Sequence, residues 1–149
     1  MPRPLEFVVL DEPTASLDVF IQAPFIDLLA GMRDEMGLTY LFISRDLGLV
    51  RYFCDRIVVM YLEAVVEILP TAAAKARHPD TRALIDCGFA PDPTHRRAIT
   101  PLAAKSPARS TCHPAGPLPG RCSRVSYRSR NERPVLDAST RPAACWYPL

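Results

Sequence analysis

Residues 5–18 read Leu-Glu-Phe-Val-Val-Leu-Asp-Glu-Pro-Thr-Ala-Ser-Leu-Asp, and this stretch decides the fold class. Residues 5–10 are mostly apolar, with β-branched Val8 and Val9, and the run stops abruptly at two carboxylates, Asp11 and Glu12. Such a run is typical of a buried parallel strand that ends at a site. Because ligands of open α/β sheets bind outside the carboxyl ends of the strands, we expect both carboxylates to project into one crevice.

The two adjacent carboxylates suit the chemistry of nucleotide phosphates. An Asp at the first position can support a Mg²⁺ ion that carries the phosphates, and the neighbouring Glu can polarise the water that attacks the γ-phosphate. A buried strand that simply ends in an acidic loop or helix cap is the alternative. The apolar run followed by Asp11 and Glu12 does not by itself decide between these interpretations.

A long helix is expected after this stretch. Asp18 is a plausible N-cap, and Gly37 has the character of a residue that ends a helix. Pro24 lies inside the segment, which predicts a kink or a later start of the helix, because proline removes a backbone donor at a cost of roughly 3 kcal/mol. The expected apolar face consists of Ile21, Phe25, Leu28, Leu29, Met32 and Met36.

The following residues predict a second strand beside the first and a hairpin further on. Residues 39–44 are aromatic and β-branched, so residue 45 should lie beside Glu12. The hairpin has Glu63-Ala64 at its turn, where positive φ angles cost about 1 kcal/mol per residue without glycine. The remaining expected elements are a helix over residues 47–54, hairpin strands over 55–62 and 65–69, a short helix from Thr71 and a helix over 80–87.

Charge and proline content divide the chain into two parts. Residues 1–90 hold 8 Lys or Arg against 13 Asp or Glu, whereas residues 91–149 hold 10 against 3. Ten of the 16 prolines also fall in the second part, where no helical or strand period is sustained. This composition predicts a folded domain over residues 1–90 and an irregular basic tail over residues 91–149. No apolar run approaches the ~20 residues of a membrane helix, and no secretion signal is recognisable, so a cytoplasmic protein is expected.

The five cysteines are an odd number in a chain without a recognisable secretion signal. They argue against a secreted disulfide framework and leave free thiols or metal ligation. Cys54 and Cys87 lie in periodic apolar segments and are expected to be core residues. The other three, Cys112, Cys122 and Cys145, fall in the basic tail.

The continuation of the first stretch resembles a known family. Residues 11–18, Asp-Glu-Pro-Thr-Ala-Ser-Leu-Asp, are similar to the Walker B and D-loop sequence of ABC-transporter ATPases, with Ser16, Leu17 and Asp18 as the D-loop. The resemblance is to the ATP-binding subunits of oligopeptide/dipeptide importers, and it is continuous over residues 4 to about 97 and patchy beyond. Further matching segments are residues 37–44, 46–47, 55–62, 66–68 and 78–84.

This resemblance implies an α/β fold, the C-terminal part of a P-loop ABC ATPase domain, with ATP and Mg²⁺ as the family's cofactors. It implies that Asp11 supports Mg²⁺ and Glu12 activates water. Ser16 and Asp18 would be the D-loop residues of the cofactor site, with Asp18 acting across a dimer with a second ATPase subunit. Transmembrane permease subunits are the other implied partners, so the subunit would be peripheral on the cytoplasmic face of the membrane. In the family residue 45 is the switch histidine, whereas Arg45 can pair with phosphate oxygens but cannot act as a neutral imidazole. A solvated arginine at a strand end is the alternative.

The sequence also departs from the family. It contains no Gly-Lys pair, which the phosphate-binding glycine loop requires, and no Leu-Ser-Gly-Gly-Gln signature. We therefore expect a truncated subunit that is catalytically inactive by itself. The family's tail carries four cysteines that can hold a [4Fe–4S] cluster, and Cys122 and Cys145 match two of these positions. The first and third positions fall on Gly116 and Ser129, with Cys112 out of step, so the cluster is expected to be lost.

Two further hypotheses come from other functional classes. The chain could be a non-catalytic interaction module that binds a partner, such as an intact ATPase, through its sheet edge and basic tail. A nucleic-acid partner is the second hypothesis, because Tyr127 lies among arginines that can contact phosphates. No recognisable nucleic-acid motif accompanies them, so no specific nucleic acid is expected. The arginines are Arg121, Arg124, Arg128, Arg130 and Arg133.

Overall fold

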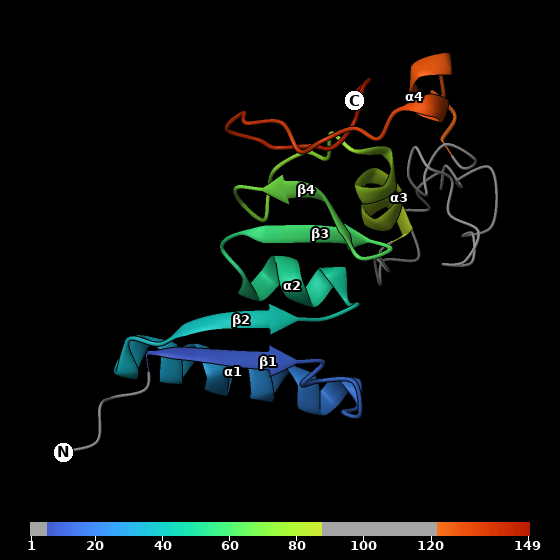
Figure 1. Ribbon diagram of the computed structural model, residues 1–149. Coiled ribbons are helices and arrows are strands. Elements are labelled where there is room, and N and C mark those ends of the chain that lie inside the picture. Colours follow the sequence, from blue (N-terminus) through green and yellow to red (C-terminus); the bar gives the residue numbers. More distant parts are fainter. Residues whose placement is uncertain (1–5, 88–121) are drawn as a thin grey trace. The chain divides into compact units, whose positions relative to one another are not determined.

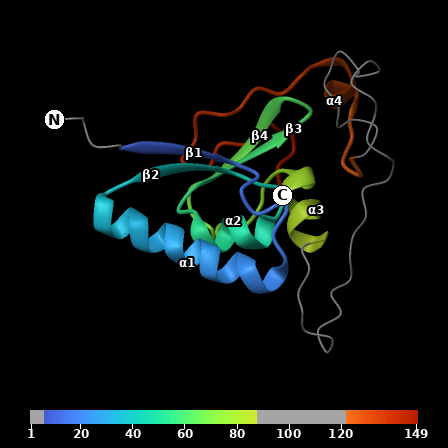
Figure 2. The ribbon, with the colours of Figure 1, turned by 90° about the horizontal axis from the view of Figure 1, so that it is seen from below.

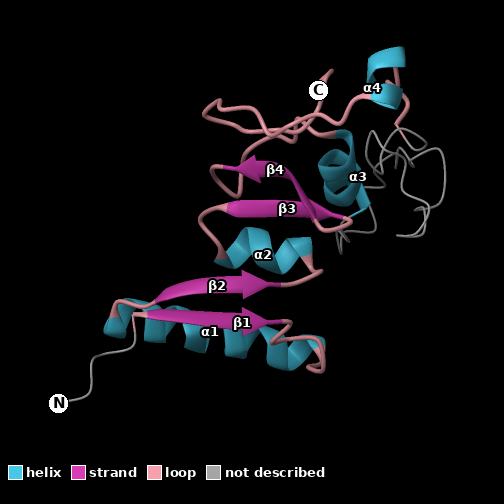
Figure 3. Cartoon of the chain, in the orientation of Figure 1, coloured by secondary structure: helices cyan, strands magenta, loops and turns pink. Residues whose placement is uncertain are grey.

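The computed structural model describes residues 6–87, where helices and strands are mixed, and residues 122–149, which contain the short helix α4 (Figures 1 and 3). The chain divides after Cys54 into two compact units. The first unit contains β1 (Phe7–Asp11), α1 (Val19–Met36), β2 (Thr39–Ile43) and α2 (Leu47–Phe53). The second contains β3 (Ile57–Tyr61), β4 (Ala64–Leu69), α3 (Pro79–Cys87) and α4 (Tyr127–Asn131).

Strands β1 and β2 form a parallel two-stranded sheet, as the sequence predicts. Their register runs from Phe7 opposite Thr39 to Asp11 opposite Ile43. The long helix α1 connects the two strands, which is the usual crossover for a parallel pair. Both strands therefore deliver their carboxyl ends, and the residues that follow, to the same edge of the sheet.

The core of the first unit lies between one face of this sheet and the helices α1 and α2 (Figure 2). Ile26 and Leu29 of α1 and Phe53 of α2 are buried at its centre. The Phe53 ring lies 5.7 Å from the ring of Tyr40 and 5.3 Å from that of Phe42, in tilted and edge-on arrangements that favour aromatic packing. The core is thus built from alternate residues of the strands and one face of each helix.

The prediction of a buried parallel strand holds for one face of the sheet, where Leu10, Tyr40 and Phe42 pack against the core, and is wrong for the other face. Phe7 and Val9 of β1 are each 55% exposed, and Leu41 and Ile43 of β2 are 47% and 44% exposed. Side chains alternate across a strand, and both helices of this unit pack on the same face of the sheet, so the other face is left uncovered within the unit. We call Phe7, Val9, Leu41 and Ile43 the open sheet face.

Helix α1 begins and ends where the sequence predicts. The Asp18 carboxylate accepts a hydrogen bond from the Ile21 N–H at 3.0 Å, and Gly37 ends the helix in the left-handed conformation with φ of 66°. The helix includes Pro24, so of the two expected outcomes the later start is wrong and the kink stays a prediction. Pro24 leaves the carbonyl of Phe20 without its usual donor, and Phe20 is exposed to water that can replace it.

The expected apolar face of α1 is only partly correct. Ile26, absent from the predicted set, is buried together with Leu29, and Phe25 packs against them. The other predicted members are exposed because the sheet has only two strands and reaches a narrow part of the helix surface. These exposed residues are Ile21, Leu28, Met32 and Met36.

The second unit contains the predicted antiparallel hairpin of β3 and β4. Its turn is formed by Leu62 and Glu63, with φ of 43° and 66°, so the strained positions lie one residue earlier than Glu63-Ala64. The short helix expected from Thr71 is wrong, because this segment forms a turn in which the Ala74 N–H donates to the Thr71 carbonyl at 3.1 Å. Helix α3 follows as expected.

A C-terminal segment pairs with β4, although the sequence predicts only irregular chain there. Glu67 and Ala143 form an antiparallel bridge. The Ile68 N–H donates to the Pro142 carbonyl at 2.9 Å, and the Ala144 N–H donates to the Val66 carbonyl at 2.8 Å. These bonds cover the edge of β4. Predictions for Leu5, Cys112, Gly116, the Cys87 side chain and the boundary between residues 90 and 91 lie outside what the structure describes.

Candidate functional site

The acidic residues predicted for the site lie at the carboxyl ends of β1 and β2. Asp11 is the last residue of β1, and its side chain is exposed. Glu12 follows with a positive φ of 48°, and its N–H donates to the Ile43 carbonyl at 2.9 Å. A glutamate in the left-handed region is strained, and strain of this kind is concentrated at functional positions. The sheet register therefore fixes the direction in which Glu12 leaves the strand.

Arg45 lies beside Glu12, as predicted from the two strand ends. Its Nε donates to Glu12 Oε1 at 2.8 Å, and the two form an ion pair. The Arg45 side chain is 88% exposed, which agrees with the alternative of a solvated arginine at a strand end. It is nevertheless bound to the Glu12 carboxylate. The pairing of these two side chains was not predicted.

The turn between β1 and α1 is held by a residue that the sequence analysis missed. The Gln22 amide on α1 donates to the carbonyls of Thr14 at 3.4 Å and Leu17 at 3.2 Å. Thr14 is buried beneath this turn. A polar residue one turn after a helix cap, in an otherwise apolar segment, is the sequence signal that could have identified Gln22. Its bonds position the backbone on either side of Ser16.

Two acidic residues near this edge serve as helix caps. Asp18 caps α1, and the Asp46 carboxylate accepts from the Leu49 N–H at 3.1 Å to cap α2. Ser16 is exposed in the turn. Within the described part of the chain, Asp11 is the carboxylate of this edge with no hydrogen bond or ion pair to protein. The structure thus brings together Asp11, Glu12 and Arg45, while Asp18 is engaged by its own helix.

These residues fit only part of what ATP and Mg²⁺ require. The Asp11 oxygens are hard ligands of the type that Mg²⁺ prefers. A phosphate cradle needs successive backbone N–H groups and a lysine, and the 149 residues contain no Gly-Lys pair. The side chains at this edge can therefore help to bind a cation and a water molecule. The backbone N–H groups and the lysine that bind the phosphates have to come from other sequence.

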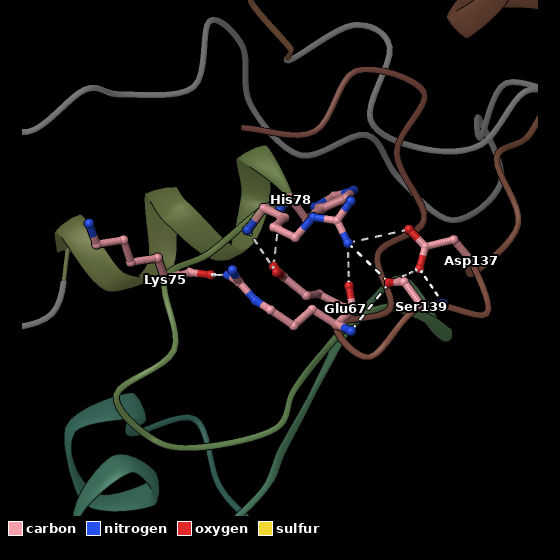
Figure 4. Close-up of polar contacts among 7 residues, drawn as sticks. Glu67, Lys75, His78, Asp137 and Ser139 are labelled. Carbon is pink, nitrogen blue, oxygen red and sulfur yellow. Dashed lines mark hydrogen bonds and ion pairs between the residues drawn. The ribbon is translucent and has the colours of Figure 1, made fainter.

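A second polar constellation lies in the second unit, around the buried carboxylate of Glu67 (Figure 4). The Arg77 N–H donates to Oε1 at 2.7 Å, and the His78 N–H donates to Oε2 at 3.1 Å. His78 Nδ1 accepts from the Asp80 N–H at 3.2 Å. Burial lowers the pKa of His78 from 6.5 to about 4, although the charge of Glu67 opposes this. His78 is therefore a neutral acceptor at neutral pH.

The guanidinium of Arg77 joins this constellation to the C-terminal segment. It donates to Asp137 at 3.4 Å, to the Ser139 hydroxyl at 3.2 Å and to the Arg141 carbonyl. Hydrogen bonds from Ser139 lower the pKa of Asp137. These contacts engage Arg77 and Glu67 with other groups of the protein, so the two residues build structure and are not poised for catalysis.

The cysteines predicted as remnants of iron–sulfur ligands are both half-buried thiols. The Ser129 hydroxyl, at the third ligand position, shares a hydrogen bond with Ser126 at 3.1 Å. Among residues 6–87 and 122–149, no three His, Cys, Asp or Glu side chains are grouped to hold a metal ion. A [4Fe–4S] cluster is normally held by four thiolates, and Ser129 offers a hydroxyl in place of one, so the loss of the cluster stays a prediction.

None of the helices in the described ranges has the length and apolar character needed to cross a membrane.

Comparison with known proteins finds relatives but no matching family model. The chain is 47% identical over 93 residues to a Brucella ovis protein named for peptide import and ATP binding, covering 61% of this chain. It is 44% identical over 94 residues to the oligopeptide transport ATP-binding protein OppF of Bacillus subtilis, covering 62%. A third relative, named as a peptide ABC transporter ATP-binding protein of Sinorhizobium fredii, is 38% identical over 136 residues, covering 87%.

The chain spans 29%, 31% and 37% of the lengths of these three relatives. The similarity thus concerns a part of each relative and most of this chain. It agrees with the Walker B and D-loop resemblance in residues 11–18 and with the parallel strands that carry it. The chain is a homologue of the peptide and oligopeptide import ATP-binding proteins of ABC transporters, as its motifs predict.

Proposed function

We propose that residues 6–54 form the part of an ABC transporter ATP-binding subunit that faces Mg²⁺ and the γ-phosphate. The observation that carries this proposal is the sheet register, with Asp11 opposite Ile43, which leaves Glu12 and Arg45 at neighbouring strand ends. Carboxylates in this position are where an open α/β sheet binds its ligand. The names of the relatives supply the class of transporter.

Each residue has a proposed role in that setting. Asp11 would support Mg²⁺, which when bound neutralises charge on the phosphates. Glu12 would polarise the attacking water, and Ser16 and Asp18 would face a second ATPase subunit. Arg45 stands where the family has a histidine, and its pairing with Glu12 favours a changed role for this position.

The proposed biological role is uptake of oligopeptides or dipeptides, driven by ATP hydrolysis. A second ATPase subunit and transmembrane permease subunits are the proposed partners, because they are what the resemblance to ABC-importer ATPase subunits implies. The protein would then be cytoplasmic, or peripheral on the cytoplasmic face of the membrane when assembled.

We propose further that these 149 residues do not hydrolyse ATP alone. Positioning and charge neutralisation of the phosphates supply most of the catalysis in phosphoryl transfer, and the sequence lacks the glycine loop and lysine that provide them. The test is phosphate release by the purified chain, with Glu12→Gln as the control. We expect equal background rates, and steady release that Glu12→Gln abolishes would overturn the proposal.

A second candidate function is a non-catalytic module that binds a partner protein, such as an intact ATPase. The open sheet face favours it, because four large apolar side chains are about half exposed on one small sheet. Measurement of Mg-ATP binding by the isolated chain separates the candidates. Saturable binding that Asp11→Asn weakens supports the nucleotide site, and its absence together with capture of the partner supports the module.

A further inference from the structure

The backbone between Glu12 and the start of α1 is folded into two successive turns. The Ala15 N–H donates to the Glu12 carbonyl at 3.1 Å, and the Leu17 N–H donates to the Thr14 carbonyl at 3.1 Å. Each bond joins residues three apart, as in a β-turn, and the two turns share Thr14 and Ala15. Ser16 is exposed in the second turn, so its position depends on what holds that turn in place.

Gln22 fastens the second turn to α1. Its side-chain amide donates to the Thr14 carbonyl at 3.4 Å and to the Leu17 carbonyl at 3.2 Å. Its backbone N–H donates to the Asp18 carbonyl at 3.1 Å, as part of the helix. One residue of α1 therefore binds the backbone before Ser16, after Ser16 and at the helix cap.

The length and the chemistry of the Gln22 side chain both suit these contacts. Its amide nitrogen carries two N–H donors, one for each of the two carbonyls. The Thr14 carbonyl accepts from both the Leu17 N–H and the Gln22 amide, which uses both of its lone pairs. A side chain of the same length without donors would leave the Leu17 carbonyl without this partner. The contacts thus depend on the amide group and not on the bulk of the side chain.

We propose, on the basis of the function proposed above, that Gln22 is a positioning residue that makes the turn carrying Ser16 move together with α1. Gln22 binds three carbonyls of residues 14–18, whereas the Ala15 N–H provides one bond from this turn back to Glu12. A shift of α1 would therefore be passed to Ser16 and Asp18, the two residues proposed to face a second ATPase subunit. The hydrogen bonds hold whether or not that function is correct.

The test is amide hydrogen exchange of the full chain, followed residue by residue by NMR. Gln22→Met keeps the length of the side chain and removes both donors. Exchange at Leu17 should become faster on the order of five- to tenfold, with a smaller change at Leu29 in the core of the same unit. Ala23→Met is the matched control, because Ala23 is an exposed neighbour on the same helix.

Two results of this experiment would overturn the proposal. The first is equal exchange at Leu17 in Gln22→Met and Ala23→Met, which would show that the amide does not hold the turn. The second is a rise at Leu29 as large as the rise at Leu17, which would show that Gln22 stabilises the whole unit and does not position the turn.

A second variant separates hydrogen bonding from packing, and it also serves if Gln22→Met misfolds. Gln22→Glu keeps the shape of the side chain, but its ionised carboxylate has no donor and faces two carbonyl oxygens. Once protonated, its O–H can donate to one of them, so the pKa of the introduced carboxyl should lie above the usual value of about 4.3.

The rate of exchange at Leu17 is then compared between Gln22→Glu and the unmodified chain at each pH. The ratio should be on the order of five to ten at pH 7 and fall toward one as the introduced carboxyl is protonated. Glu12 and Asp18 are present in both proteins, so their own titration cancels in this ratio. A ratio that stays the same over the titration contradicts the proposed role of the amide.

Failure of this proposal and failure of the proposed function give different results. A chain that shows the expected exchange at Leu17 but never engages nucleotide or a second ATPase subunit contradicts the function alone. Mg-ATP binding that Asp11→Asn weakens, together with exchange at Leu17 that Gln22→Met leaves unchanged, contradicts the role of Gln22 alone.

Discussion

Arg45 places a permanent positive charge against the carboxylate that the proposed chemistry would use. In the ion pair with Glu12, the guanidinium occupies an oxygen that would otherwise face water. The pair is largely exposed, and exposed pairs contribute only about 0 to 1 kcal/mol to stability. Its effect therefore concerns the availability of Glu12 more than the stability of the unit.

The first prediction concerns Arg45 in a setting where hydrolysis is possible. A chimera carries this segment in a complete, active relative that supplies the glycine loop and signature. Arg45→His should raise turnover by about 10² to 10³, the usual effect of one preorganised contact, with little change in ATP affinity. Glu12→Gln in both chimeras is the control and should abolish turnover. Equal rates with arginine and with histidine at this position would show that it has no switch role.

The second prediction concerns His78 and pH. Because burial lowers its pKa to about 4, the unfolded chain binds a proton between pH 6.5 and 4 that the folded chain does not. The contribution of neutral His78 to the free energy of unfolding should be fully present above pH 6.5. It should fall by about 2 to 4 kcal/mol as the pH approaches 4.

Urea unfolding at several pH values measures this effect. His78→Asn is the matched variant, since its side-chain oxygen can accept from the Asp80 N–H without titrating. The difference in unfolding free energy between the unmodified chain and this variant should shrink at acid pH. A difference that is constant from pH 7 to 4 would contradict the prediction.

At the scale of elements, the β3–β4 turn stores local strain. Leu62 and Glu63 both have positive φ, the conformation that hairpin turns assign to Asn and Gly. Glu63→Gly should stabilise the hairpin by about 0.5 to 1 kcal/mol, because glycine adopts this conformation without a Cβ clash. Glu63→Ala is the control and should bring no such gain. The measurement is the urea midpoint, and a lower midpoint for the glycine variant than for the alanine variant would count against the strain.

The elements were largely predictable from sequence, and their environments were not. The caps at Asp18 and Gly37 and the strand ending at Asp11 are local signals, and the structure contains all three. Which face of α1 is buried depends on how many strands it covers, and no local pattern reports that. The pairing of Ala143 with Glu67 was missed for the same reason, because it joins residues far apart in the chain.

The candidate site was predictable to a similar extent. Glu12 and residue 45 were expected side by side from the parallel strands, and the structure confirms this. Their ion pair depends on side-chain conformations that sequence does not encode locally. Gln22 was missed because its partners are backbone carbonyls, so its polar character one turn after the helix cap was the one available sequence signal.

At the scale of the molecule, the open sheet face predicts self-association. Leu41→Lys introduces a charge at its centre and should reduce aggregation while the fold is kept, because Leu41 lies outside the core of its unit. Thr39→Lys, at an exposed polar position of the same strand face, is the matched control and should have a smaller effect. Sedimentation velocity measures both. A monomeric unmodified chain with a sharp, cooperative melt would show that this face does not drive association.

Arg77 also has a consequence for the order of events during synthesis. Its N–H donates to Glu67, ten residues earlier in the chain. Its guanidinium donates to Asp137 and to the Arg141 carbonyl, and its carbonyl accepts from the Leu149 N–H, so these bonds form only after the C-terminal residues are made. A ribosome adds about 5 to 20 residues per second, so the 60 positions between Arg77 and Asp137 take roughly 3 to 12 s to make. During that interval the edge of β4 is uncovered in the nascent chain, and a chaperone could bind it.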